Sequence, residues 1–307
     1  MWSYSLRRLL GAIPTLFVVM TVSFFMMRLA PGGPFDRERM LSPAVEENIK
    51  RAYDLDQPLV VQYGRYLWKA LHGDLGPSFK YQDYAVVDLI ASGFPVSFQI
   101  GLSAIIAALT IGGVLGVVAA LRQNSLLDHL VMAIAMIGIT IPNFVVAPIL
   151  TLIISVYLKL LPAGGYGDGG WRNLLLPTVA VALPPIAFIA RLMRASMIEV
   201  LRSNYIRTAR AKGLPARIVL GRHALRAAIL PVISYLGPAI AGIISGSVVI
   251  ETIFGIPGIG RYFVQGALNR DYTLVMGVVI FYGALIILLN LVVDLVYGLL
   301  DPKVRYD

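Results

Sequence analysis

The sequence predicts an all-α polytopic membrane protein with six transmembrane helices, and three observations support this fold class. Of the 307 residues, 58% are hydrophobic and only 14% are charged, against about 25% charged residues in soluble domains. The mean hydropathy is +0.77. Six stretches reach or approach the roughly 20 apolar residues that a helix needs to cross a bilayer. Together these observations exclude a typical cytosolic enzyme and a disordered chain.

The first predicted span covers residues 9–27, which are uncharged and follow Arg7 and Arg8. This apolar run is longer than the core of a usual signal peptide, and no A-x-A-like site follows it, so we expect an uncleaved helix. The fourth span is short and is interrupted by three prolines, which membrane helices tolerate as kinks. The other five predicted spans after the first are residues 98–121, 130–158, 173–190, 227–250 and 272–293.

The distribution of Lys and Arg predicts the orientation. Residues 191–226 hold nine basic residues and one acid, which places this loop in the cytoplasm. Residues 31–95 hold seven basic and nine acidic residues, as expected of an external segment. With six spans, both termini are then cytoplasmic. The formal net charge of +9 would suit nucleic acid, but most basic residues border apolar runs, so the sequence indicates a membrane and no nucleic-acid partner.

We therefore divide the chain into three parts: residues 1–30 are a tail and first helix, 31–97 an external insertion, and 98–307 a core with a cytoplasmic loop at 193–226. In the insertion, Ser42-Pro43 and Asp56-Gln57-Pro58 are typical helix starts. After the second start, apolar residues and one glycine recur at helical spacing, at Val60, Gly64, Leu67 and Leu71. Such an amphipathic helix lies on a membrane surface, on a partner, or on the chain's own spans.

Two loops carry distinctive patterns. In the cytoplasmic loop, Ile198, Leu201, Tyr205 and Ala209 fall on one side of a basic helix that breaks near Gly213-Leu214-Pro215. The external loop 251–271 is rich in glycine yet apolar, which indicates either a re-entrant turn at the mouth of a pathway or a tight interfacial turn. Its candidate gate residues are Gly255, Pro257, Gly258 and Gly260.

Polar residues inside the predicted spans are candidates for lining a pathway, although most intramembrane Ser and Thr bond to their own helix. Asp294 is the only acid that we expect near a span interior, in an interfacial salt bridge. Two patterns, Gly112–Gly116 and Gly242–Gly246, allow close helix approach within the subunit or against a partner. The candidate pathway residues are Thr140, Asn143, Ser234, Ser245 and Ser247.

The composition argues against a catalytic or metal site in this chain. It has no Cys, its three His residues are far apart without metal-ligand spacing, and no Walker A pattern occurs, so any ATP must bind another polypeptide. An ion-coupled secondary transporter would require intramembrane carboxylates or His, and an intramembrane hydrolase a Ser–His or paired-Asp constellation. The predicted spans offer neither.

The cytoplasmic loop resembles the EAA loop of permeases from ATP-binding-cassette (ABC) importers. Ala209, Gly213 and Leu225 match the family pattern, whereas residues 207, 208, 223 and 226 depart from it. Residues 205–214 are similar to the variant found in peptide permeases, and so are residues 28–32, 73–76, 256–260 and 268–272. With residues 74–81, DLGPSFKY, the whole chain resembles permease subunits of bacterial oligopeptide importers.

This resemblance implies a type I importer permease fold in the bacterial inner membrane. It implies a non-catalytic subunit that binds no cofactor, pairs with a second permease, receives peptide from a periplasmic binding protein, and works with two ATPase subunits that hold ATP and Mg. Dipeptides, nickel complexes and glycosides are alternative cargoes on the same scaffold. The implied contacts with an ATPase subunit are Tyr205, Ile206, Arg207, Thr208, Ala209, Arg210, Ala211, Lys212, Gly213 and Leu214.

Overall fold

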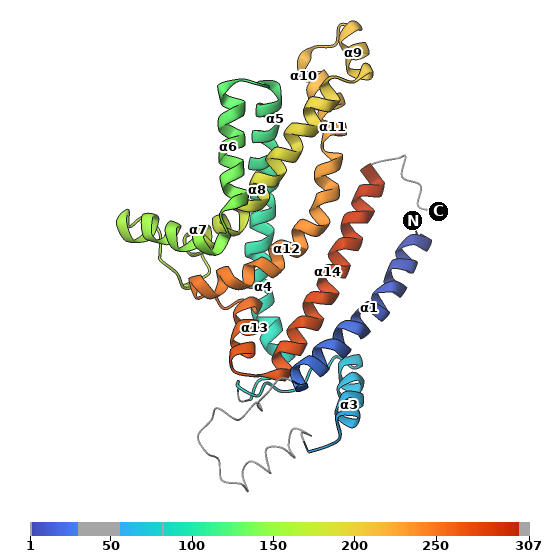
Figure 1. Ribbon diagram of the computed structural model, residues 1–307, viewed down its shortest axis with the longest axis vertical. Coiled ribbons are helices and arrows are strands. Elements are labelled where there is room, and N and C mark those ends of the chain that lie inside the picture. Colours follow the sequence, from blue (N-terminus) through green and yellow to red (C-terminus); the bar gives the residue numbers. More distant parts are fainter. Residues whose placement is uncertain (1, 30–55, 82, 301–307) are drawn as a thin grey trace. The chain divides into compact units, whose positions relative to one another are not determined.

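The structure, a computed structural model, describes residues 2–29, 56–81 and 83–300, with side chains except at 2–9, 238, 241, 244–246 and 297–300. The Ser42-Pro43 helix start and the C-terminal tail lie outside these ranges. The regular elements within them are helices, apart from one isolated β-bridge between Pro77 and Ala85. The chain forms two compact units: unit 1 contains residues 97–256 and the end of the last helix, and unit 2 contains residues 7–96 and 257–285 (Figure 1).

Five helical stretches in the described part are long and apolar enough to cross a membrane, or up to seven when two bent pairs each count as one span, against the six predicted. The helix α4 (Val86–Ala107) continues through a π-helical turn into α5 (Gly113–Leu121). The five stretches are Leu10–Leu29 in α1 (Trp2–Leu29), Val86–Leu121, Trp171–Leu201 as α8, Ala216–Gly237, and Tyr272–Val296 in α14 (Tyr272–Leu300).

The predicted span 130–158 is a bent pair rather than one helix. α6 (Leu126–Thr140) and α7 (Asn143–Leu150), which continues as a π-helical segment to Tyr157, meet at an angle of 104°. The break falls at Ile141-Pro142, because proline disfavours helical backbone in the residue before it, and Ile141 is extended. The predicted short span 173–190 differs in the opposite sense, since α8 runs unbroken through its three prolines.

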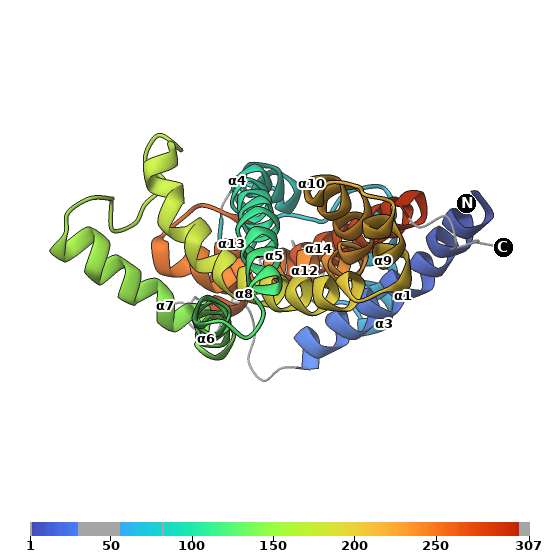
Figure 2. The same ribbon diagram turned by 90° about the horizontal axis from the view of Figure 1, so that it is seen from above.

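Helix α8 is the centre of unit 1. It packs against α5, α6, α7 and α12 (Leu230–Phe254), and α5, α6 and α8 lie side by side (Figures 1 and 2). Gly112 and Gly116 make the approach to α8 close. A Cβ atom would lie 2.6 Å from the Ile186 oxygen at Gly112, and 2.5 Å from the Ala190 oxygen at Gly116. The first predicted glycine pattern therefore packs within the subunit, whereas a Cβ at Gly242 would meet open space.

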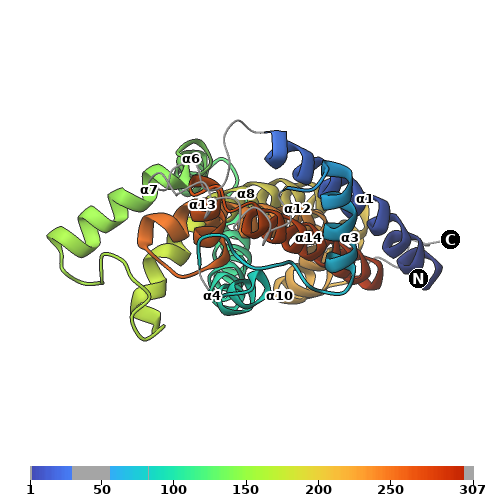
Figure 3. The same ribbon diagram turned by 90° about the horizontal axis from the view of Figure 1, so that it is seen from below.

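Unit 2 contains the predicted amphipathic helix, α3 (Leu59–Leu71), beside α1 (Figure 3). Tyr66 of α3 packs in one buried cluster with Phe24 of α1 and Met276 of α14. The hydroxyls of Thr21 and Tyr63 lie 2.5 Å apart. The expected apolar stripe faces outward, because Val60 and Leu71 are each 77% exposed while the opposite face, with Tyr66, is buried.

The segment after α3 is fixed by hydrogen bonds to the start of α14 and to α13 (Ile259–Leu268). Ser78 donates to the buried Asp271 carboxylate, and the Thr273 hydroxyl donates to the Pro77 oxygen at 2.6 Å. Tyr81 donates to the side-chain oxygen of Gln265. Residues almost two hundred positions apart in the sequence are thereby held together within unit 2.

Candidate functional site

The predicted coupling segment forms a short helix at one end of α8. α8 continues to Leu201, so the first part of the predicted loop 193–226 is helical, and α9 (Asn204–Ala211) follows after a break at Arg202 and Ser203. Figures 1 and 2 show α9 and α10 (Ala216–Ile218) close together at this end. The turn that ends α9 is built on Gly213, whose φ of +74° is the left-handed conformation that glycine adopts without strain.

The break between α8 and α9 changes which residues are buried. Ile206 is 0% exposed and Ala209 is 7% exposed, and both belong to one core cluster with Met197 of α8. Tyr205, which the helical spacing placed on one side with Ala209, is 47% exposed while Ala209 is buried, because α9 starts a new helical register. The other coupling candidates on the helix and its C-cap are exposed, and they are Arg207, Thr208, Arg210, Ala211 and Lys212. α9 therefore presents a cationic outer face on an apolar base.

A cavity of about 300 Å³ lies in unit 1 among α6, α7, α8 and α12. Asn143 alone among the five pathway candidates lines it. Phe188 and Tyr235 stack with ring centroids 4.1 Å apart and line the same cavity. The cavity is mostly apolar, and its two polar groups are the amide of Asn143 and the hydroxyl of Tyr235. The rest of its wall consists of Ile139, Val181, Pro184, Pro185, Ala239, Gly242 and Ile243.

The hydroxyl-bearing candidates are placed differently. Thr140 donates to the Met136 oxygen at 2.8 Å and Ser234 to the Leu230 oxygen at 3.2 Å, as the usual back-bonding of such residues predicts. Ser247 is buried and donates to the Glu251 carboxylate at 2.9 Å. The side chain of Ser245 lies outside the described part of the structure.

Three acids in the described part of the chain are 0% exposed, Asp128, Glu251 and Asp271, whereas the sequence reasoning expected only Asp294 near a span interior. Asp128 is 0% exposed, and both its carboxylate oxygens accept hydrogen bonds from Arg194, at 2.5 and 2.6 Å. Ser125 caps α6 three residues before Asp128, and that spacing was the available signal. Glu251 is also 0% exposed, because α12 continues to Phe254 and includes a residue that we assigned to the external loop.

The candidate gate residues form the connection between α12 and α13. Gly255 ends α12 in a left-handed conformation, with φ of +65°. The backbone N–H of Ile256 donates to the backbone carbonyl oxygen of Glu251 at 2.8 Å. Gly258 is the N-cap of α13, and both Gly258 and Gly260 are buried. Pro257 is partly exposed. The four residues thus lie in the turn that follows α12 and at the start of α13.

Within the described part of the chain, no group of three or more His, Asp or Glu side chains is placed to hold a metal ion.

The ion pair Asp128–Arg194 is bidentate, and charge-assisted pairs of this geometry fix the orientation of the two side chains, here on α6 and α8. The described features that contain the predicted site residues are the α9 surface, the α12–α13 connection and the cavity that Asn143 lines.

Comparison with known proteins agrees with this architecture. The family model described as binding-protein-dependent transport system inner membrane component matches residues 112–306, and the model of its N-terminal region matches residues 1–101. The chain is 57% identical over 306 residues to the oligopeptide transport system permease protein OppB of Escherichia coli (strain K12), covering 100% of both chains. Identity to the OppB protein of Haemophilus influenzae is 53%, again over 100% of both chains.

A relative with a different named cargo is more distant. The dipeptide transport system permease protein DppB of Bacillus subtilis (strain 168) is 46% identical over 302 residues, which cover 98% of this chain and 97% of that one. The predicted resemblance to ABC-importer permeases is confirmed. This chain belongs to the family of binding-protein-dependent transport system inner membrane components, the permease subunits of ABC transporters in bacterial inner membranes.

Proposed function

We propose that this chain and a second permease together form the membrane pathway of an oligopeptide importer. Two ATPase subunits hold ATP and Mg and drive transport, and a periplasmic binding protein delivers the peptide. The full-length identity of 57% to an oligopeptide permease supports this cargo over dipeptides, for which the quoted relative is 46% identical. Nickel complexes and glycosides are the remaining alternatives, and no residue of the described cavity selects among them by charge.

The observation that carries the coupling proposal is the construction of α9. Its outer face is exposed and cationic, as suits a surface that docks in a groove of another protein. Its inner face is fixed by Ile206 and Ala209 in the same core as Met197. A movement of the ATPase that shifts α9 would therefore shift the end of α8 as a rigid body, and ATP drives it through different affinities for two states.

The cavity beside Asn143 supports the pathway proposal. Its volume of about 300 Å³ lies at the lower end of the range of about 300–1,000 Å³ for small-molecule sites, so it holds at most a few side chains. A mostly apolar wall with one amide and one phenol makes few demands on the cargo. A second permease would complete the pathway, and the binding protein would supply selectivity.

The test is co-purification in mild detergent followed by measurement of ATP hydrolysis and uptake. Recovery of a second permease and two ATPases is expected, with hydrolysis stimulated by binding protein loaded with tri- to pentapeptides more than by dipeptides. Recovery of the chain alone, with ATP-independent transport in liposomes, would contradict the proposal. Equal stimulation by dipeptides would reject the assigned cargo and leave the coupling proposal intact.

A matched pair of glycine variants tests α9 directly. Gly213→Ala places a Cβ on a left-handed backbone and should separate ATP hydrolysis from peptide uptake. Gly221→Ala is the control, because Gly221 is exposed, has an ordinary φ and would place its Cβ in open space. Equal coupling ratios in the two variants would refute the role of the α9 turn.

A further inference from the structure

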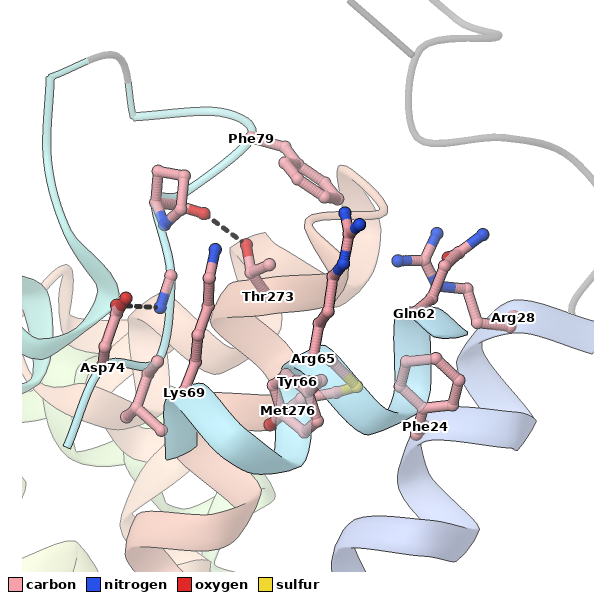
Figure 4. Close-up of a pocket in the computed structure, with 13 residues that line it drawn as sticks. Phe24, Arg28, Gln62, Arg65, Tyr66, Lys69, Asp74, Phe79, Thr273 and Met276 are labelled. Atoms are coloured by element: carbon pink, nitrogen blue, oxygen red, sulfur yellow. Dashed lines mark hydrogen bonds between the residues drawn. The ribbon is translucent and has the colours of Figure 1, made fainter. Parts of the chain in front are cut away.

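Unit 2 contains a separate cavity of about 170 Å³ where the end of α1, α3 and the start of α14 meet (Figure 4). Three cationic side chains line it: Arg28 from the last turn of α1, and Arg65 and Lys69 from α3. We propose that this cavity binds the phosphate group of an anionic phospholipid. This inference is independent of the transported cargo and of the coupling helix.

The charge of the cavity favours an anion. Arg65 and Lys69 are four residues apart, so they share one face of α3, and in Figure 4 their cationic groups and that of Arg28 extend in the same direction. The lining contains one acid, Asp74, whose Oδ1 accepts the Gly76 amide at 2.8 Å. An anion beside Arg28 and Lys69 is attracted by both charges, and phosphate oxygens offer acceptors to several donors at once.

Two hydrogen-bond donors in the wall are buried without an acceptor among the described residues: Nε of Arg28 and the hydroxyl of Tyr66. The Arg28 guanidinium lies 5.5 Å from the Phe24 ring centroid and 5.7 Å from that of Tyr272, contacts that leave its N–H edges available. Tyr66 is 9% exposed, and burial raises the pKa of its phenol, so this group remains a neutral donor. Buried donors are rarely left without an acceptor in proteins, so these two groups offer hydrogen bonds to an oxygen of a ligand in the cavity.

The size of the cavity selects the kind of ligand. Its 170 Å³ is well below the range of about 300–1,000 Å³ for drug-sized ligands, which excludes an oligopeptide. The same volume is that of about five to six water molecules in the liquid, enough for one phosphate group with its nearest substituents. The ligand therefore enters the cavity by a small anionic head.

The position in the fold favours a lipid over a soluble phosphate. The apolar stretch of α1 ends at Leu29, next to Arg28, and that of α14 begins at Tyr272, next to Thr273. Arg28 and Thr273, which both line the cavity, therefore lie at the membrane–water interface, where lipid phosphates lie. α3 has the character of an interfacial helix, since one face carries cations while the other exposes Val60 and Trp68 at 77% and 67%.

The experiment measures lipid binding by the full-length chain in detergent, by native mass spectrometry with added phosphatidylglycerol, phosphatidylcholine or glycerol 3-phosphate. The double variant Arg65→Gln/Lys69→Gln should weaken phosphatidylglycerol binding about tenfold or more, since each cation near a membrane surface contributes to anionic-lipid affinity. Both side chains are exposed, so the fold is retained. Arg122→Gln, an exposed cation at the end of α5, is the matched control and should change binding less than about twofold.

A second variant tests whether a buried group of the cavity, and not only the exposed charge, contributes to lipid binding. Tyr66→Phe removes only the buried hydroxyl and should weaken phosphatidylglycerol binding while the melting temperature stays at or above that of the wild type. Equal retention of phosphatidylglycerol by the wild type and the double variant would overturn the proposal. Glycerol 3-phosphate binding as tight as the lipid's, with the same sensitivity to the variants, would show a soluble phosphate ligand instead. Loss of affinity for the binding protein, with lipid binding unchanged, would assign the cations to a protein contact and also overturn it.

Discussion

Removing one member of the Asp128–Arg194 pair should destabilise the chain strongly and unequally. The pair joins the first turn of α6 to α8, and the carboxylate side chain is 1% exposed while that of Arg194 is 25% exposed. Arg194→Met leaves a buried carboxylate whose remaining described partner is the backbone N–H of Asn124, at 2.9 Å. Asp128→Asn leaves a guanidinium that still reaches the surface.

The burial of the two groups sets the expected magnitudes. Breaking a buried ion pair by removing one partner costs about 3–5 kcal/mol, and the partial exposure of Arg194 favours the lower end. We therefore expect Arg194→Met to cost about 3 kcal/mol. Asp128→Asn should cost about 1–2 kcal/mol, because its amide still accepts the Asn124 bond and the freed cation is hydrated. The double variant should be more stable than the sum of the singles by about 2 kcal/mol.

The assay is reversible unfolding of the purified chain in mixed micelles titrated with a denaturing detergent, with the two single variants and the double variant forming a cycle. Arg191→Met, one turn earlier on α8, is the control. Arg191 is exposed, and its guanidinium lies 5.3 Å from the Phe188 ring, a contact worth about 0.5–1 kcal/mol. Additive single effects, or an Arg194→Met cost no larger than that of the control, would refute the assigned strength of the pair.

Three further outcomes follow from packing and are measured by the same unfolding assay. Gly116→Leu should cost about 3 kcal/mol or more, since even its Cβ would lie 2.5 Å from a carbonyl oxygen of α8. Gly113→Leu is the control and should cost less than about 1 kcal/mol, because its Cβ would lie in open space. Equal costs for the two variants would contradict the close approach of α5 to α8. Ile206→Ala should cost about 2–5 kcal/mol because the side chain is 0% exposed, and Tyr205→Ala on the outer face less than about 1 kcal/mol; a reversed order would mean that α9 packs by its other face. Tyr66→Phe should be neutral or stabilising by up to about 1 kcal/mol, because it removes a buried hydroxyl without a described partner; a clear loss would show that the hydroxyl is satisfied.

Hydropathy and charge predicted the class of protein because transfer of apolar side chains into a bilayer depends on composition within one segment. The resemblance to permeases was also local, since its motifs are short runs of residues. A proline within an apolar run signals a break or a kink, but the angle of 104° between α6 and α7 at Pro142 depends on what α7 packs against. The three prolines of α8 also show that proline alone does not predict a break, because that helix continues through all of them.

The burial of the acids could not be predicted from the sequence, for a different reason. Asp128 and Arg194 are 66 residues apart, and no periodicity within either helix reports that they meet. Glu251 was assigned to a loop because the apolar run before it ends one residue earlier, whereas the helix continues one more turn to a glycine cap. For α3 the sequence left the covering surface open, since helical spacing of apolar residues predicts that a face exists but not which surface covers it, and in the structure Val60 and Leu71 face outward.

In the coupling mechanism proposed above, α8 is the element that connects the docking helix with the pathway. Met197 lies in the core that holds α9, and Pro184 lines the cavity beside Asn143, thirteen positions earlier on the same helix and therefore about 20 Å away. Packed interiors transmit displacement rather than absorb it, because they contain few voids. Gly116 brings α5 into backbone contact with α8 between these two points, and Asp128 ties α6 to it there. A push on α9 would therefore move these helices together, and the paired prolines at the cavity, where backbone hydrogen bonds are missing, are where α8 bends most easily.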